Sequence, residues 1–206
     1  MKKVLGLLYT PVTPRIGMAV GKNDLIMRDR LQFDIDVGGD TATVYGRIDL
    51  SDFVNVVTGK GLAIKEVRYQ LRNPTGNVIN GALDPYLNAA GSTFASIKMY
   101  ATTSAYENAA DVGISSPNVL SVVEMTSVTV STIDGIAIQN NWVEWSTPDL
   151  HPSGYNVVTD LLIGIAAKDC TALNDSTLEV DIMLIAEPIK LTKDDLNDML
   201  IQAQDL

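Results

Sequence analysis

Residues 31–37 (Leu-Gln-Phe-Asp-Ile-Asp-Val) alternate strictly between apolar and polar side chains. A period of two predicts a β-strand with one buried face and one face in water. Similar runs, rich in Val, Ile and Thr, recur along the chain between turn-forming clusters of Gly, Asn, Asp and Pro. From residue 31 onward they predict eight strands, at residues 31–37, 41–50, 62–72, 94–103, 119–132, 142–146, 160–168 and 177–187.

Antiparallel strands joined by alternating short and long connections favour a two-sheet sandwich. We therefore expect an all-β fold: an eight-stranded antiparallel β-sandwich (single jelly roll) over residues 31–188. An extended N-terminal arm would occupy residues 1–30, and a C-terminal amphipathic helix would lie within residues 189–206. The period of two predicts that one set of side chains is buried, namely Phe33, Ile35, Val67, Tyr69, Leu71, Ile163 and Ile165. It predicts that another set faces water, namely Asp34, Asp36, Glu66 and Arg68.

The first 30 residues differ from the rest in charge. They hold six basic against two acidic residues, a net +4, and the rest hold nine against 23, a net −14. Because Pro and Gly interrupt this segment, we expect an extended arm. Its cations would meet an anionic partner, either lipid head groups or genome: Lys2, Lys3, Arg15, Lys22, Arg28 and Arg30. A plain solvated tail remains the alternative.

The apolar tip of this arm would be an assembly contact through Leu5, Leu7 and Leu8. It would dock on a neighbouring subunit or a head-group layer, or add an edge strand to its own or an adjacent sheet. This apolar run is too short for the core of a signal peptide, so we expect no cleaved signal.

The end of the chain carries a helix signal. Residues 192–195 (Thr-Lys-Asp-Asp) have the pattern of a capping box, and two aspartates favour the positive end of a helix dipole. Leu196, Met199 and Leu200 follow at the spacing of one helix face. The pattern predicts a helix over residues 193–204, with these three residues as contacts to its own sandwich or to a neighbouring subunit.

Few residues are available for catalysis. The chain contains one His (His151) and one Cys (Cys170), which excludes an intramolecular disulfide and a Cys/His metal site. A catalytic triad would have to use His151, which lies in a turn without a nucleophile elbow nearby. We therefore expect no enzymatic activity and no cofactor.

Two binding sites remain open from the residues alone. Five aspartates between residues 34 and 52 could ligate Ca²⁺, although a solvated strand face is the commoner explanation for Asp34 and Asp36. Loops around Trp142, Trp145 and Tyr155 could bind a carbohydrate or a receptor. A spacing of three places the two tryptophans on opposite faces of a strand, which weakens a shared platform.

Six parts of the chain carry a resemblance of layout: residues 1–30, 31–37, 41–57, 61–76, 177–187 and the helix over 192–206. Together they resemble the single jelly-roll capsid proteins of tailless icosahedral viruses, including those with an internal membrane. The resemblance implies a self-assembling capsid subunit that forms an icosahedral shell through loop, arm and helix contacts.

The same resemblance implies a place in the virion after synthesis in the host cytoplasm. The implied partners are other copies of the chain and other virion proteins, with membrane lipid or genome at the arm. Since sandwiches of this kind serve several functions, a carbohydrate- or receptor-binding module and a phage tail-type virion protein remain alternatives.

Overall fold

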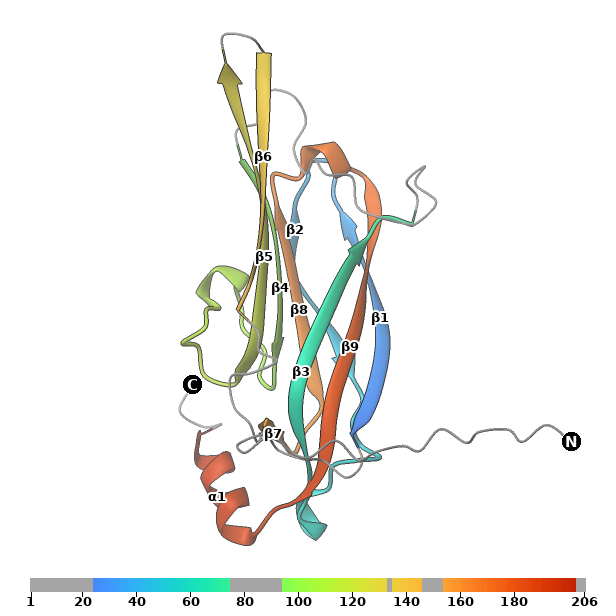
Figure 1. Ribbon diagram of the computed structural model, residues 1–206, viewed down its shortest axis with the longest axis vertical. Helices are drawn as coiled ribbons and strands as arrows, with labels where there is room; N and C mark the ends of the chain where they lie inside the picture. Colours follow the sequence, from blue (N-terminus) through green and yellow to red (C-terminus); the bar gives the residue numbers. More distant parts are fainter. Residues whose placement is uncertain (1–23, 75–93, 133–134, 146–153, 203–206) are drawn as a thin grey trace, which may run out of the picture.

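The alternating run at residues 31–37 lies in a longer strand of an all-β fold (Figure 1). The computed structural model describes residues 24–74, 94–132, 135–145 and 154–202. The strands are β1 (Leu25–Ile35), β2 (Thr41–Ile48), β3 (Lys60–Arg72), β4 (Phe94–Thr102), β5 (Val119–Thr132), β6 (Gly135–Glu144), β7 (Tyr155–Val157), β8 (Leu161–Lys168) and β9 (Ser176–Lys190). Three short 3₁₀ turns (Val56–Thr58, Ala109–Asp111 and Thr171–Leu173) and one helix, α1 (Lys193–Gln202), complete the described elements.

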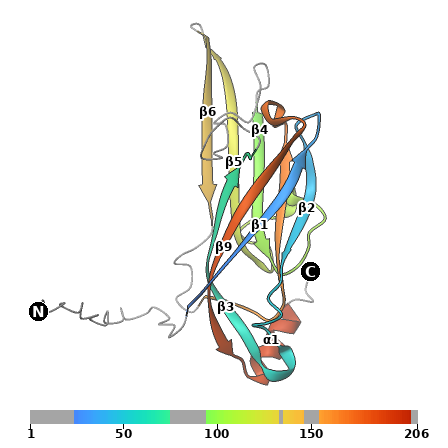
Figure 2. The same cartoon turned by 90° about the vertical axis from the view of Figure 1, so that its right-hand side faces the viewer.

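The strands form two antiparallel sheets that face each other (Figure 2). One sheet has the order β1-β9-β3-β7, and the other has the order β2-β8-β4-β5-β6. The predicted antiparallel sandwich is confirmed. The expected strand number was one too low, because the three-residue β7 pairs only with Leu62–Ile64 of β3 and has too few residues to produce a periodic pattern.

The pairing of the strands is nested along the sequence, with early strands pairing with late ones. β1 pairs with β9, β2 with β8, β3 with β7, and β4 with β5. These pairs enclose one another along the sequence, as in a long hairpin ribbon that has been rolled into two layers. β6 belongs to none of these four pairs. It pairs with the other side of β5 and so extends the five-stranded sheet by one strand.

The core lies between the sheets, and the alternating strand contributes as expected. Phe33 and Ile35 are buried, whereas Asp34 and Asp36 are exposed. Val67, Leu71, Ile163 and Ile165 are also buried, as predicted. Glu66 and Arg68 lie on the outer side of β3, where Arg68 is exposed and Glu66 is half-buried by its ion pair with Arg68.

A bulge in β3 changes which of its residues face the core. The register with β9 shifts between Ile64 and Glu66. The core residues are therefore even-numbered before the bulge (Leu62, Ile64) and odd-numbered after it (Val67, Leu71). An extra residue of this kind reverses the alternation of a strand.

Tyr69 was also predicted to be buried. It points inward with Val67 and Leu71, but it is only half-buried. Its hydroxyl group lies 2.5 Å from Ser121 Oγ of β5, so one hydrogen bond joins the two sheets.

The sandwich begins earlier than predicted. β1 pairs with β9 along its whole length, from Leu25 opposite Ala186 to Ile35 opposite Ser176. Leu25 and Met27 pack against the core. Residues 25–30 therefore belong to the sheet and not to an arm, and β9 continues to Lys190, past the expected end at residue 188. The rest of the predicted arm, residues 1–23, lies outside the described residues.

The C-terminal helix begins as predicted. The Thr192 hydroxyl accepts from the Asp195 amide at 3.2 Å, and Asp195 Oδ2 accepts from the Thr192 amide at 2.9 Å. This reciprocal pair is a capping box. The helix is described to Gln202, and the remaining residues of the expected range lie outside the description. Among the described helices, none has the length and apolar character of a membrane span.

Candidate functional site

The outer face of the four-stranded sheet carries the two described cations of the predicted anionic-partner set, Arg28 and Arg30. Both point away from the core from β1, on the side opposite Phe33. The register places Arg30 beside Asp181 of β9, with Gln70 of β3 on the far side of Asp181. The adjacent row across the same strands reads Arg28, Met183 and Arg68.

An ion-pair network neutralises Arg30. Its Nε lies 2.5 Å from Asp181 Oδ1, and its Nη2 donates to Asp181 Oδ2 at 3.2 Å. Arg72 Nη1, on β3, approaches the same Asp181 at 3.4 Å. Both guanidinium groups also lie 3.6 Å from Glu179 Oε2, whose side chain is buried by the contact.

This network explains the charge state of its members. The hydrogen bond from Arg30 lowers the pKa of Asp181, and the same bond raises the pKa of Arg30. The carboxylates of the central strand therefore satisfy Arg30 and Arg72 within the sheet. Arg30 belongs to a cross-strand ion-pair network, so its charge is already balanced before any partner binds.

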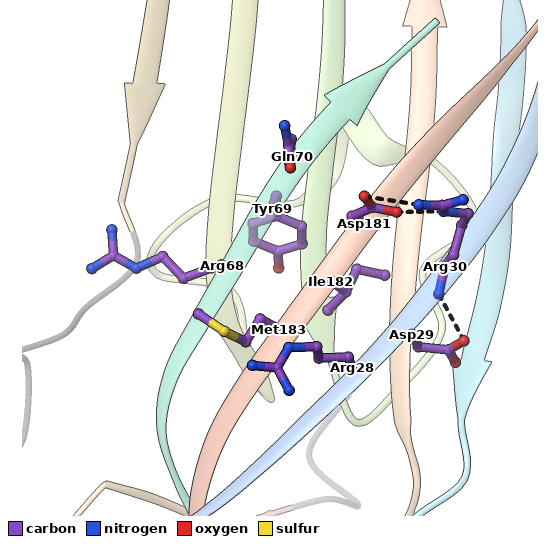
Figure 3. A pocket seen from close by; sticks show the side chains of 9 residues that line it. All are labelled: Arg28, Asp29, Arg30, Arg68, Tyr69, Gln70, Asp181, Ile182 and Met183. Carbon is purple, nitrogen blue, oxygen red and sulfur yellow. Dashed lines mark hydrogen bonds and ion pairs between the residues drawn. The ribbon is translucent and has the colours of Figure 1, made fainter. Parts of the chain in front are cut away.

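Arg28 is in a different position. A depression of about 670 Å³ opens on this face, and Arg28 and Arg68 flank Met183 at its floor. Figure 3 shows Arg28 beside Met183, while Arg30 turns toward Asp181. Arg68 forms an ion pair with Glu66, whereas Arg28 has no ion-pair partner in the described part of the chain. Arg28 is therefore a cation of this face whose charge no described carboxylate balances.

The helix residues separate into two groups. Leu196 is 7% exposed within a single chain, so it docks α1 on its own chain and is not available as an assembly contact. Met199 is half-buried, and the Leu200 side chain lies outside the description. The other predicted contacts also lie outside the described residues: Lys2, Lys3, Leu5, Leu7, Leu8, Arg15 and Lys22.

The aromatic residues of the alternative binding site do not form one platform. Trp142 on β6 lies opposite Met125 of β5, while the Trp145 amide donates to Val122 O at 2.8 Å. Three residues apart on an extended chain, the two rings point to opposite sides. Tyr155 lies on β7 at the edge of the other sheet.

Two of the aspartates considered for Ca²⁺, Asp36 and Asp40, have other roles in the described structure. Asp36 Oδ1 accepts from the amides of Gly38 and Asp40, both at 2.8 Å, and so closes the turn after β1. Asp40 forms an ion pair with Lys168, and the Lys168 hydrogen bond lowers the pKa of Asp40. Within the described ranges, no group of three or more His, Cys, Asp or Glu side chains is placed to hold a metal ion.

Sequence reasoning missed Arg68 as a neighbour of Arg28, because the two residues are 40 positions apart and meet only through the pairing of β1 and β3 with β9. It also missed most of β6. Only residues 142–146 were expected there, since residues 135–141 combine Gly, apolar and amide residues without a clear alternation.

No protein-family model matches the sequence, and no curated protein matches it. A search of solved structures finds a chain from Desmodium yellow mottle tymovirus. The two chains are 11% identical with a TM-score of 0.30, and the match covers 94% of this chain and 98% of that one. A TM-score this low does not establish a shared fold.

Proposed function

We propose that this chain is a structural virion protein, a self-assembling capsid subunit of the jelly-roll type. The observation that carries the proposal is the nested strand pairing, β1–β9, β2–β8, β3–β7 and β4–β5. Jelly rolls of two such sheets are used in viral capsids, in lectins and in cupins. The single histidine of this sequence cannot supply the multi-histidine metal cluster that a cupin site resembles.

Assembly requires only modest contacts. In a closed shell each subunit repeats the same contacts with several neighbours, so weak individual interfaces add up through multivalency. The two sheets supply a rigid body, and projecting elements can reach neighbouring copies. In this proposal the protein acts mechanically, as a component of the particle, and its partners are further copies of itself and other virion proteins.

A second proposed contact involves Arg28. Its guanidinium, which has no ion-pair partner among the described residues, would bind phosphate groups of lipid or genome on the outer face of the four-stranded sheet, whereas Arg68 across β9 is already paired with Glu66. Arg30 would not take part, because Asp181 and Glu179 already balance its charge. This differs from the predicted arm, in which every cation of residues 1–30 was available.

The alternative function is a carbohydrate- or receptor-binding module. Exposed rings at Trp142, Trp145 and Tyr155 favour it, with 43%, 42% and 41% of each residue accessible. Their positions on different faces and different sheets disfavour a single stacking platform.

The decisive experiment is sedimentation velocity of the full chain over a range of concentrations, combined with negative-stain electron microscopy. We expect rings, shells or sheets whose abundance rises with concentration. A monomer at every concentration would contradict the capsid proposal. If that monomer also bound one family of glycans on an array, the binding-module alternative would replace it.

A further inference from the structure

The four edges of the two sheets differ in how well they are protected against pairing with another strand. β1 carries three consecutive charged residues, Arg28 to Arg30, and β7 has only three residues. β2 has an irregular register between Thr41 and Val44. Charges, bulges and short length are the devices by which natural sheets prevent edge-to-edge association.

β6 has almost none of these devices, because its one charged residue is Glu144 at its end. It is ten residues long and pairs with β5 in an uninterrupted register, from Val123 opposite Glu144 to Thr132 opposite Gly135. Residues 135–143 contain no charged residue and no proline. Its far side has no strand neighbour in the part of the chain that the structure describes. An edge of this kind is a template for strand addition.

The β5–β6 hairpin also projects from the molecule. In both views the hairpin extends beyond the ends of the other strands of both sheets (Figures 1 and 2). At about 3.4 Å per residue, β6 offers an edge roughly 34 Å long. The turn end of this edge therefore stands clear of the other strands.

Over three positions on either side of Asn140, the sequence of β6 is chemically symmetric. Positions 139 and 141 are amides (Gln and Asn), positions 138 and 142 are large and apolar (Ile and Trp), and positions 137 and 143 are Ala and Val. In an antiparallel pair of identical strands centred on one residue, position 140+n lies opposite position 140−n. Directly opposite side chains share one face of the sheet, so amide would meet amide and apolar would meet apolar.

We propose that β6 pairs antiparallel with β6 of a second copy of this chain, about a two-fold axis at Asn140. Two five-stranded sheets would then become one continuous sheet, with an isologous interface. The inference rests on the proposed function in one respect, because it names one contact by which subunits would assemble. Charge supports a second copy as the occupant: two chains of net charge −10 repel least where the meeting segments carry no charge.

The register makes a sharp prediction for single cysteines. A disulfide needs Cβ atoms about 3.5–4.5 Å apart. Directly opposite residues, at about 4.5–5.5 Å, reach this range with a small approach of the two strands, whereas diagonal neighbours, at about 7–8 Å, do not. Under mild oxidation, Asn140→Cys is expected to convert most of the full chain to a covalent dimer. Asn141→Cys, which lies diagonal to its own copy, and Gln70→Cys, exposed on β3, are expected to remain monomeric on a non-reducing gel. The native Cys170 is buried and serves as the silent background.

Charge variants test the same register without a covalent bond. Gln139→Lys/Asn141→Lys would place like charges directly opposite each other twice across the seam, which is destabilising. Gln139→Lys/Asn141→Glu introduces as many charges but places opposite signs across the seam. In sedimentation velocity we expect the first variant to lose the β6-linked dimer and the second to keep it. The second variant also controls for folding of the hairpin.

The outcomes separate this inference from the proposed function. Equal behaviour of the two charge variants, or cross-linking of Asn140→Cys no greater than that of Gln70→Cys, would overturn the β6 pairing. Particles that form normally in all variants would overturn it too and leave the capsid proposal in place. A cross-linked dimer with the predicted charge dependence, in a chain that forms no larger particle, would support the pairing and contradict the capsid proposal.

Discussion

Gly164 of β8 lies between Tyr45 of β2 and Tyr100 of β4 in one row across the five-stranded sheet. A Cβ atom built on Gly164 would stand 2.2 Å from Cζ of Tyr100. The missing side chain allows the two rings to meet edge to face over the glycine, with centroids 5.9 Å apart. Their hydroxyl groups are 2.6 Å apart. Tyr45 Oη also accepts from the Tyr106 amide at 2.7 Å, and this hydrogen bond holds the connection after β4 against the sheet.

This relationship predicts a strong effect of one methyl group. Gly164→Ala should destabilise the protein by about 1–3 kcal/mol, the usual cost of overpacking a filled site. The measurement is chemical unfolding followed by fluorescence. Gly113→Ala is the matched control, because no atom lies within 4 Å of the Cβ position there. An unchanged midpoint for Gly164→Ala would show that the Tyr100 ring moves aside at no cost.

The hydrogen bond between the sheets makes a second prediction. Burial raises the pKa of Tyr69, so its hydroxyl stays protonated and bound to Ser121. Tyr69→Phe leaves the buried Ser121 hydroxyl without this partner and should cost about 1–3 kcal/mol. The double variant Tyr69→Phe/Ser121→Ala should cost less than the sum of the two single variants. Simple additivity in this cycle would mean that the two hydroxyls do not stabilise each other.

The acidic limb of stability should depend on Asp181 and Asp40. Hydrogen bonds from Arg30 and Lys168 lower the pKa of these two carboxyl groups below 3.8 in the folded chain. A lowered pKa contributes stability that is present above 3.8 and is lost as the pH falls through the folded value. Thermal unfolding at a series of pH values should therefore show a loss of stability at and below pH 3.8. Asp181→Asn should reduce the steepness of that loss, and an unchanged slope would contradict the assignment.

The thiol of Cys170 should be unreactive in the native protein. Burial raises the pKa of its thiol to about 11, so almost no thiolate forms at neutral pH. Alkylation by iodoacetamide, followed by mass spectrometry, should label Cys170 only after denaturation. The same reagent should label the native Gln70→Cys variant at its introduced thiol, since this position is exposed. Native labelling of both thiols at similar rates would show that the region around Cys170 opens readily.

Arg28 should govern binding of phosphate-bearing partners. We expect the full chain to bind a single-stranded oligonucleotide or vesicles of anionic lipid in a salt-dependent manner. For the oligonucleotide, Arg28→Ala should reduce the slope of log K against log salt by about 0.7. Lys60→Ala, an exposed cation at the end of β3, is the matched control. A slope that does not change in Arg28→Ala would remove the proposed anion contact.

Local patterns in the sequence were enough to predict the features that depend only on residues close together in the chain. The alternation at residues 31–37 identified a strand and its buried face, because a strand turns successive side chains to opposite sides. Residues 192–195 identified the start of α1, because a capping box involves only residues within one turn. The fold class followed from several such runs together.

Only the tertiary structure decided the features that depend on strand register. β1 begins at Leu25 because β9 provides a partner for its first residues, which no local pattern indicates. The bulge after Ile64 determines which residues of β3 face the core, and the pairing of β9 with both neighbours brings Arg28 beside Met183 and Arg68. These outcomes depend on which distant segments hydrogen-bond to each other. A single sequence records the propensity of each strand, but the partners and their alignment are selected by the packing of the whole sandwich.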